Sequence, residues 1–258
     1  MIRAFDIKNK LENHTAELIM SSWKNNAVKV IHLRSDLDKE DDMRAFYEEF
    51  GYKIGDYKMF AEDVKLGDRN NQKSGKIWMD VRYDTNINDA YRHSSNPQPL
   101  HTDGSYIPDF PSSTIMCCVS NTAEGGETIF LDIEKLIKVL KEEKPELLDF
   151  LFKNEFVHER SGFLNKRKIL YKDSKGYKVN FNYYCISKKN PTEHLSVADE
   201  FFSYLNTSES IKKEIMEVKL NPGEAVFWKD RELLHGRNGF TPKKNSERFL
   251  WKAAIQIG

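Results

Sequence analysis

The stretch LHTDGSY at residues 100–106 places an imidazole and a carboxylate two residues apart. In a strand, residues i and i+2 point to the same side, so His101 and Asp103 can reach one metal. The later stretch LLHGR at residues 233–237 supplies a second imidazole, His235. Two imidazoles and one carboxylate on one face of an iron, with the opposite positions open, form the facial triad of non-haem Fe(II) oxygenases. These three side chains are therefore candidates for one metal site; the alternatives are that His101 and Asp103 are surface polar residues of a loop and that His235 is a core histidine.

A third stretch, ERFLW at residues 247–251, places Arg248 in an otherwise apolar and aromatic strand near the C-terminus. A buried guanidinium needs an anionic partner, and its fork of donors suits a carboxylate. That partner is either a ligand or an acidic side chain in an ordinary salt bridge.

Four segments together resemble the taurine dioxygenase-like branch (TauD/TfdA, with the clavaminate synthase-like enzymes) of the Fe(II)/2-oxoglutarate dioxygenases. They are LHTDGSY at 100–106, GGETIFLD at 125–132, NPGEAVFWKDRELLHGR at 221–237 and ERFLWKA at 247–253. The resemblance covers roughly residue 76 to the C-terminus.

This resemblance implies that Fe(II) is held by the triad and that 2-oxoglutarate and dioxygen are co-substrates. It also implies that Arg248 holds the distal carboxylate of 2-oxoglutarate and that Thr128, after the paired glycines, assists. The other interpretation of Thr128 is a residue chosen for its β-propensity. Halogenation is disfavoured, because related halogenases replace the carboxylate with a small residue, whereas Asp103 is present here.

Several further side chains are weaker candidates for contacting the substrate. Lys252 follows Arg248 by four positions and shares its strand face if no bulge intervenes, so it could pair with an anionic substrate group or be a solvated lysine. Arg237 could play a similar part or lie on the surface. The remaining candidates for lining the pocket are Tyr106, Arg160 and Trp228.

The fold predicted from the pattern of short strands is mainly β with flanking helices, and specifically a double-stranded β-helix, or jelly-roll barrel. Aromatic residues make up 12% of the 258 residues, which favours a β-rich core. We expect one domain over 1–258, with an N-terminal helix and strand cap over 1–75. The jelly-roll core, with helical insertions, would then cover 76–258.

Local patterns predict the elements of this fold. Helices are expected at 11–24, 38–50, 132–140, 145–152 and 196–217. Strands are expected at 27–33, 77–83, 113–119, 128–131, 225–228 and 248–257, with a hairpin over 169–186. Loops are expected at 62–76 and at 84–99, and the second is a candidate wall or lid because it directly precedes the metal motif.

Composition limits the partners. The 40 basic and 40 acidic side chains cancel, so no net charge favours nucleic acid or an anionic membrane. The first ten residues lack the apolar run of a signal peptide, and no stretch has the roughly 20 apolar residues of a membrane span. The three cysteines are expected as buried apolar residues, with metal ligation as the alternative. We predict a cytoplasmic protein; aromatic strands would support a homo-oligomer if exposed, or belong to the core.

The predicted activity is hydroxylation of an unactivated C–H bond in a small polar substrate, an amino acid or a related amine or carboxylate, with release of succinate and CO2. Desaturation, cyclisation or epimerisation would need only a different substrate pose. A hydrolase using zinc or another metal on the same ligands is a further alternative. From another class, a catalytically silent module that binds metal or 2-oxoglutarate would give no succinate with any substrate.

Overall fold

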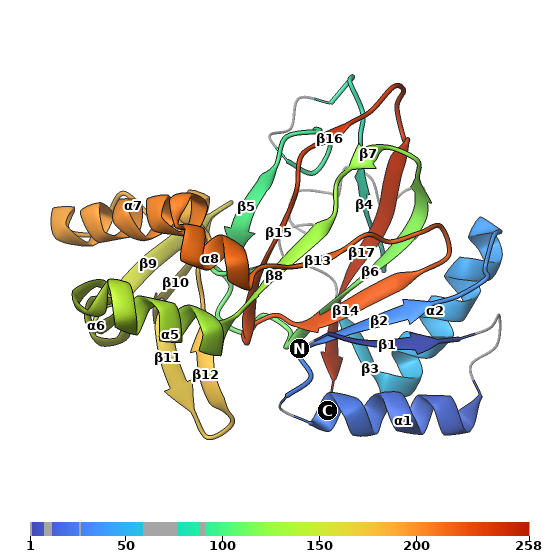
Figure 1. Ribbon diagram of the computed structural model, residues 1–258, viewed down its shortest axis with the longest axis horizontal. Coiled ribbons are helices and arrows are strands. Elements are labelled where there is room, and N and C mark those ends of the chain that lie inside the picture. The colour runs from blue at the N-terminus through green and yellow to red at the C-terminus, as the bar shows by residue number, and fades with distance from the viewer. Residues whose placement is uncertain (1, 8–11, 26, 59–76, 88–90, 258) are drawn as a thin grey trace.

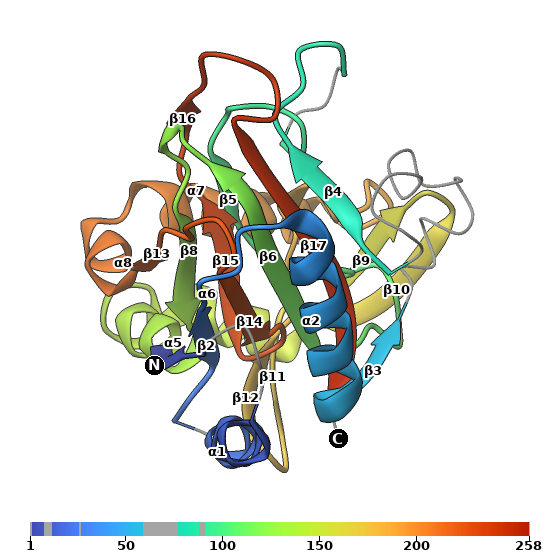
Figure 2. The same ribbon diagram turned by 90° about the vertical axis from the view of Figure 1, so that its right-hand side faces the viewer.

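The computed structural model describes residues 2–7, 12–25, 27–58, 77–87 and 91–257. They form two principal β-sheets that lie against each other, with helices on both outer surfaces (Figure 1 and Figure 2). The arrangement is mainly β with flanking helices, as predicted from the sequence. The loop predicted at 62–76 lies outside the described residues. Within these described ranges, no helix combines the length and the apolar character needed to cross a membrane.

The larger sheet has seven strands in the spatial order β1-β2-β14-β6-β17-β3, and β4 also pairs with β17. Only the first pair, β1 with β2, is parallel. The bounds are β1 Ile2–Asp6, β2 Val30–Arg34, β3 Gly55–Lys58, β4 Met79–Arg82, β6 Ser113–Asn121, β14 Ala225–Lys229 and β17 Arg248–Ile257. Strands from both the first and the last parts of the chain therefore build one sheet.

The smaller sheet has four antiparallel strands in the order β13-β8-β15-β5. The bounds are β5 Gln98–His101, β8 Thr128–Asp132, β13 Met216–Val218 and β15 Leu233–Arg237. Because β15 lies between β8 and β5, it pairs with two strands that precede it in the chain by about a hundred residues or more. His235 is paired with His101 in this register.

Three short antiparallel pairs lie outside the two sheets. β7 (Glu124–Gly125) pairs with β16 (Phe240–Thr241), β9 (Glu155–Arg160) with β10 (Phe163–Lys168), and β11 (Leu170–Asp173) with β12 (Gly176–Val179). The 3-10 turn η1 (Tyr183–Cys185) follows.

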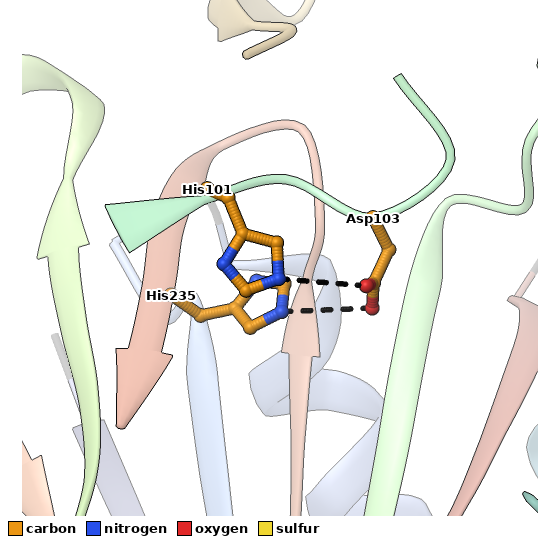
Figure 3. Close-up of side chains that lie close together, drawn as sticks. All are labelled: His101, Asp103 and His235. Atoms are coloured by element: carbon orange, nitrogen blue, oxygen red, sulfur yellow. Dashed lines mark ion pairs between the residues drawn. The ribbon is translucent and has the colours of Figure 1, made fainter. Parts of the chain in front are cut away.

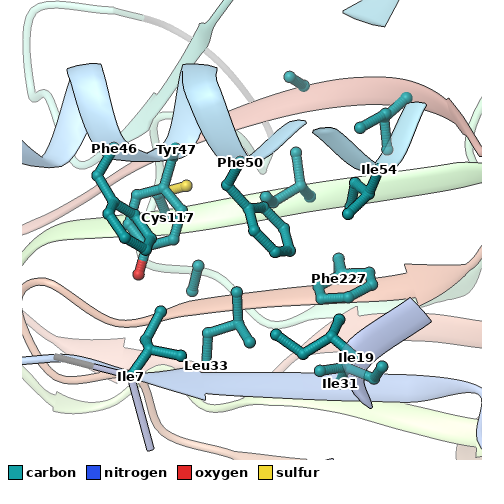
Figure 4. Close-up of a cluster of buried hydrophobic side chains, with 14 of the residues drawn as sticks. Ile7, Ile19, Ile31, Leu33, Phe46, Tyr47, Phe50, Ile54, Cys117 and Phe227 are labelled. Atoms are coloured by element: carbon teal, nitrogen blue, oxygen red, sulfur yellow. The ribbon is translucent and has the colours of Figure 1, made fainter. Parts of the chain in front are cut away.

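The helices cover the outer faces of both sheets. α1 (Asn13–Lys24) and α2 (Glu40–Ile54) pack on the larger sheet, where Phe46, Phe50 and Ile54 of α2 follow one another at intervals of four residues and contact its strands (Figure 4). Burying a side chain such as Phe50 contributes about 2–3 kcal/mol. On the smaller sheet lie α5 Ile133–Glu143, α6 Pro145–Lys153, α7 Thr192–Thr207 and α8 Glu209–Glu214.

A third apolar cluster lies between the sheets, with Met116, Val226 and Leu250 from the larger one and Phe130 and Leu233 from the smaller one. The sheets are therefore covered on both faces, which explains why strands such as β8 and β15 are buried at every position. The same burial explains why these strands show apolar runs in the sequence instead of strict alternation.

Most predicted elements are confirmed, with informative exceptions. Asp132 caps α5 by accepting a hydrogen bond from the Glu134 backbone N–H, as expected. The helical prediction over 196–217 is confirmed for most of its length, but it missed a break and the end of the helix: Ser208 ends α7 and caps α8, and β13 begins at Met216. The predicted hairpin is shorter than 169–186, since pairing covers only β11 and β12. The β9–β10 hairpin was not predicted.

Candidate metal centre and its pocket

His101, Asp103 and His235 lie together, as the sequence predicts (Figure 3). Their ligand atoms all lie within 4.8 Å of one another. His101 Nε2 is 3.8 Å from Asp103 Oδ1, and His235 Nε2 is 3.5 Å from Asp103 Oδ2. His101 ends β5 and His235 is the middle residue of β15, so the antiparallel pairing of the two strands holds the imidazoles side by side.

The nitrogen atoms are oriented for coordination. The Nδ1–H of His101 donates to the Pro99 carbonyl at 2.9 Å, which leaves Nε2 as the nitrogen with the lone pair; the Gln98 amide nitrogen lies 3.2 Å from it. His235 Nε2 is buried and has no hydrogen-bond partner among the residues that the structure describes. A buried nitrogen in this state fits a metal ligand, because the unmet hydrogen bond would otherwise destabilise the fold.

The protonation states also suit a metal. Burial lowers the pKa of His101 and lowers the pKa of His235 well below its usual range, so both imidazoles are neutral. Burial alone raises the pKa of Asp103, but the charges of Lys252 and the two histidines outweigh burial and hold that pKa below its usual range. Neutral imidazoles and an ionised carboxylate are the forms that bind a metal ion.

Lys252 lies inside this site. Its Nζ is 2.5 Å from Asp103 Oδ2, and its side chain is only 12% exposed. The pairing of β17 with β6 shifts near Phe249, but the extra, unpaired residue is Val119 on β6. Side chains along β17 therefore still alternate between the two faces of the sheet. Lys252 and Arg248 consequently line the same cavity, as the four-residue spacing predicts. Neither predicted interpretation of Lys252 named its actual partner, Asp103.

A second carboxyl group, Asp230, supports His235 from behind and was missed in the sequence. It is fully buried, and its Oδ1 lies 3.4 Å from His235 Nδ1. Trp228 Nε1 donates to the same oxygen at 3.3 Å, and Thr114 Oγ1 lies 3.5 Å from both Asp230 Oδ2 and Asp103 Oδ2. Burial, with the nearby Asp103 charge, raises the pKa of Asp230 to about 7. Such partners orient metal-binding imidazoles.

Arg248 lies at another wall of the cavity with Thr128. It is 2% exposed, its Nε donates to the Gly126 carbonyl at 3.1 Å, and its guanidinium lies over the Phe240 ring. A side chain at Gly126, which has a φ of 77°, would meet Arg248 atoms at 3.0 Å. Burial and the nearby Arg237 lower the pKa of Arg248 to about 9. Among the described residues no carboxylate forms an ion pair with Arg248, which suits an incoming acid.

The cavity has a volume of about 180 Å³. Tyr106, Arg160 and Arg237 line it as predicted, whereas Trp228 belongs to the apolar cluster between the sheets. The Trp228 ring instead lies 4.9 Å from the His235 ring, so it supports the site without facing the cavity. Arg237 also donates to the carbonyls of Ser94 and Asn96 and so fixes the end of the 84–99 loop. The remaining lining residues include Met79, Val81, Tyr91, Arg92, Gly104, Met116 and Asn182.

A smaller cavity of about 70 Å³ adjoins the first one and shares residues with it, among them Tyr91 and Arg160. Its other wall is aromatic: Tyr183 stacks on Phe202 with ring centroids 4.0 Å apart, and Tyr184 lies 5.4 Å from Tyr91. These aromatic residues carried no periodic or motif signal in the sequence. Only the fold of η1 and α7 brings them beside the metal centre.

The geometry fits the class of non-haem metal oxygenases, and comparisons with known proteins agree. The family model for taurine catabolism dioxygenase TauD, TfdA family matches residues 4–254. This chain belongs to that family.

Two curated relatives match part of the chain. Human gamma-butyrobetaine dioxygenase is 25% identical over 167 residues, which span 58% of this chain and 42% of the relative. Uridine-5'-phosphate dioxygenase from Streptomyces sp is 23% identical over 174 residues, 62% of each chain. The chain thus matches less than two thirds of either relative's length.

Solved structures share the fold at low identity. The non-heme iron oxygenase OrfP in complex with Fe and alpha-ketoglutaric acid has a TM-score of 0.71 at 13% identity, covering 95% of this chain and 80% of the other. Asparagine oxygenase in complex with Fe(II), 2S,3S-3-hydroxyasparagine and succinate has a TM-score of 0.69 at 14% identity, covering 98% and 93%.

Proposed function

We propose that this protein is an Fe(II)- and 2-oxoglutarate-dependent dioxygenase that hydroxylates an unactivated C–H bond of a small polar substrate. The observation that supports this most directly is the buried set of two neutral imidazoles and one carboxylate, His101, Asp103 and His235. Family membership and the fold of the iron oxygenases agree with it.

In this proposal His101, Asp103 and His235 hold Fe(II), and Arg248 with Thr128 binds the distal carboxylate of 2-oxoglutarate. When bound, Fe(II), 2-oxoglutarate and dioxygen would supply the oxidising power for C–H cleavage, with succinate and CO2 as the co-products. The guanidinium of Arg248 suits this task because it is buried and a carboxylate can accept two of its N–H bonds. His101, His235, Arg248 and Thr128 lie on strands and Asp103 lies in the turn after β5, so most of these groups need little reorganisation.

The charge of the residues that line the cavity favours a substrate with an acidic group, such as an amino acid or a related carboxylate. Among its described lining residues Asp103 is the only acidic side chain, whereas Arg92, Arg160 and Lys252 add positive charge beside Arg248. The solved asparagine oxygenase complex holds a hydroxylated asparagine, and an OrfP structure holds (3S)-hydroxy-L-Arg. A substrate of this size and charge is therefore our proposal for this chain.

The finer description of the fold belongs to the same proposal. We interpret the two facing sheets as the halves of a double-stranded β-helix, with the metal centre between them at one end. We also propose one domain over 1–258, because β1, β2 and β3 of the predicted cap pair within the larger sheet. The cytoplasmic location and a homo-oligomer stay predictions from the sequence.

The test is oxygen- and Fe(II)-dependent release of succinate from 2-oxoglutarate, screened across amino acids, amines and small carboxylates. Product analysis by mass spectrometry then separates hydroxylation, which adds one oxygen atom to the substrate, from desaturation or cyclisation, which remove two hydrogen atoms. Asp103→Ala and His235→Ala should abolish the signal. Oxygen-independent turnover that leaves 2-oxoglutarate untouched would indicate a metal hydrolase, and bound metal without succinate would indicate a silent binding module.

A further inference from the structure

Lys252 occupies an unusual position for a lysine, because its ammonium contacts one of the three candidate metal ligands. Nζ lies 2.5 Å from Asp103 Oδ2, and His235 Nε2 lies 3.5 Å from the same oxygen. Both side chains of the pair are largely buried, at 12% and 13% exposure. The ammonium is therefore placed where a metal ion would also be drawn.

The surroundings of Lys252 offer its charge no other partner in the described chain. Its neighbours in register are Met116 on β6 and Met79 on β4, and both methionines line the cavity. Asp103 is its only ion-pair partner among the described residues. Because apolar walls do not solvate an ammonium, the pair with Asp103 compensates for the burial of both charges.

We propose that Lys252 is the counter-ion of Asp103 in the metal-free site, and that a divalent metal must compete with it for this carboxylate. The lysine then has two opposite effects. It stabilises the protein without metal, by neutralising a buried carboxylate, and it weakens metal binding, by placing a positive charge close to a dication. This inference rests on the proposed function, because it assumes that the triad binds a metal.

The decisive measurement is the affinity for Mn(II), a probe that avoids oxidation of Fe(II), in the full-length protein without substrate. Lys252→Gln removes the charge but keeps a side chain that can donate to Asp103. We expect it to bind Mn(II) at least about tenfold more tightly, since the repulsion between ammonium and dication is lost. Lys252→Arg keeps the charge and should retain wild-type affinity. Unchanged or weaker binding by Lys252→Gln would overturn the proposal.

Thermal unfolding separates this role from a purely structural one. Without metal, Lys252→Gln should unfold at a lower temperature than wild type, because Asp103 loses its compensating charge. The stabilisation by saturating Mn(II) should be larger in the variant, by roughly 4 °C for tenfold tighter binding. A purely structural lysine would lower both melting temperatures equally. Lys252→Met serves as a second neutral variant if the glutamine variant fails to fold.

A matched control is available in the chain. Lys29 forms another buried pair with an aspartate, Asp132, at 2.7 Å, but it does not line the cavity. Lys29→Gln should lower the melting temperature and leave the Mn(II) affinity unchanged. If His235→Ala binds Mn(II) as tightly as the wild-type protein does, the metal site itself is overturned, and the inference with it. Binding that depends on His235 but not on the charge at position 252 would overturn only the inference.

Discussion

The two ends of the cavity are built differently. At the metal end, His101, His235 and Arg248 are 2–6% exposed and lie on strands β5, β15 and β17. At the other end, which the smaller cavity adjoins, Arg160 ends a hairpin strand, and Tyr184, in η1 and lining the smaller cavity, is 56% exposed. The groups that we propose to bind the metal and 2-oxoglutarate are mostly held by the sheets, whereas the groups that we propose to contact the substrate lie on peripheral segments. The comparison predicts separable effects of mutations at the two ends.

The largest effect is expected for His235→Ala at the metal end. Loss of one of three ligands should reduce 2-oxoglutarate turnover by at least about a thousandfold, because a metal contributes several kcal/mol to such reactions. Succinate formation and metal content, measured on the same preparation, check this. Normal metal content with substantial turnover would show that the triad is assigned wrongly.

Arg248→Met should raise the dissociation constant for 2-oxoglutarate by about a hundredfold, because it removes the charged partner of a buried carboxylate. Its Mn(II) affinity in the absence of 2-oxoglutarate should stay at the wild-type value. Calorimetry with each ligand in turn measures both quantities, and Arg248→Lys should recover part of the loss. An equal loss of metal binding would mean that the variant disturbs the whole site.

Asp230→Asn should lower metal affinity or turnover by about tenfold to a hundredfold, the usual effect of losing a partner behind a metal ligand. Asp230 contacts His235 and not the cavity, so the affinity for 2-oxoglutarate in the metal-loaded protein should change less. Metal titration followed by 2-oxoglutarate titration gives the two values. A variant with unchanged metal affinity and turnover would remove Asp230 from the site.

The smallest effect is expected at the substrate end. Tyr184→Ala should raise KM for the substrate by about fivefold, because one aromatic contact contributes on the order of 1 kcal/mol. Slow turnover of 2-oxoglutarate without substrate should be unaffected, which distinguishes this end from the metal end. Phe152→Ala, an aromatic substitution outside both cavities, is the matched control. Loss of substrate-free turnover in Tyr184→Ala would contradict the division between the two ends.

The sequence predicts the metal end better than the substrate end for a physical reason. The two-residue spacing of His101 and Asp103 suits one metal ion, and the resemblance of four segments to a known family added His235 and Arg248. Asp230 escaped notice because it lies in the charged run KDRE at 229–232, which has the composition of a surface turn. Its role depends on the bend between β14 and β15, which folds this one carboxyl inward.

The partner of Lys252 was likewise beyond the sequence. Strand alternation placed the lysine on the correct face, but only the packing of the two sheets, with Asp103 in the turn after β5, places the Asp103 carboxylate 2.5 Å from its ammonium. The break between α7 and α8 was also missed. Ser208 caps α8 with its hydroxyl, but the apolar residues on both sides of it suggested a continuous helix. Local patterns identify elements, whereas distances between remote segments depend on the register of the whole fold.

The position of β17 has a consequence for synthesis on the ribosome. This strand follows every other described strand in the chain, yet it lies between β6 on one side and β3 and β4 on the other. Until it emerges, β6 has an unpaired edge, and such edges invite association with other chains. The sheet must therefore close after translation of residues 248–257, through contacts distant in sequence, which form slowly.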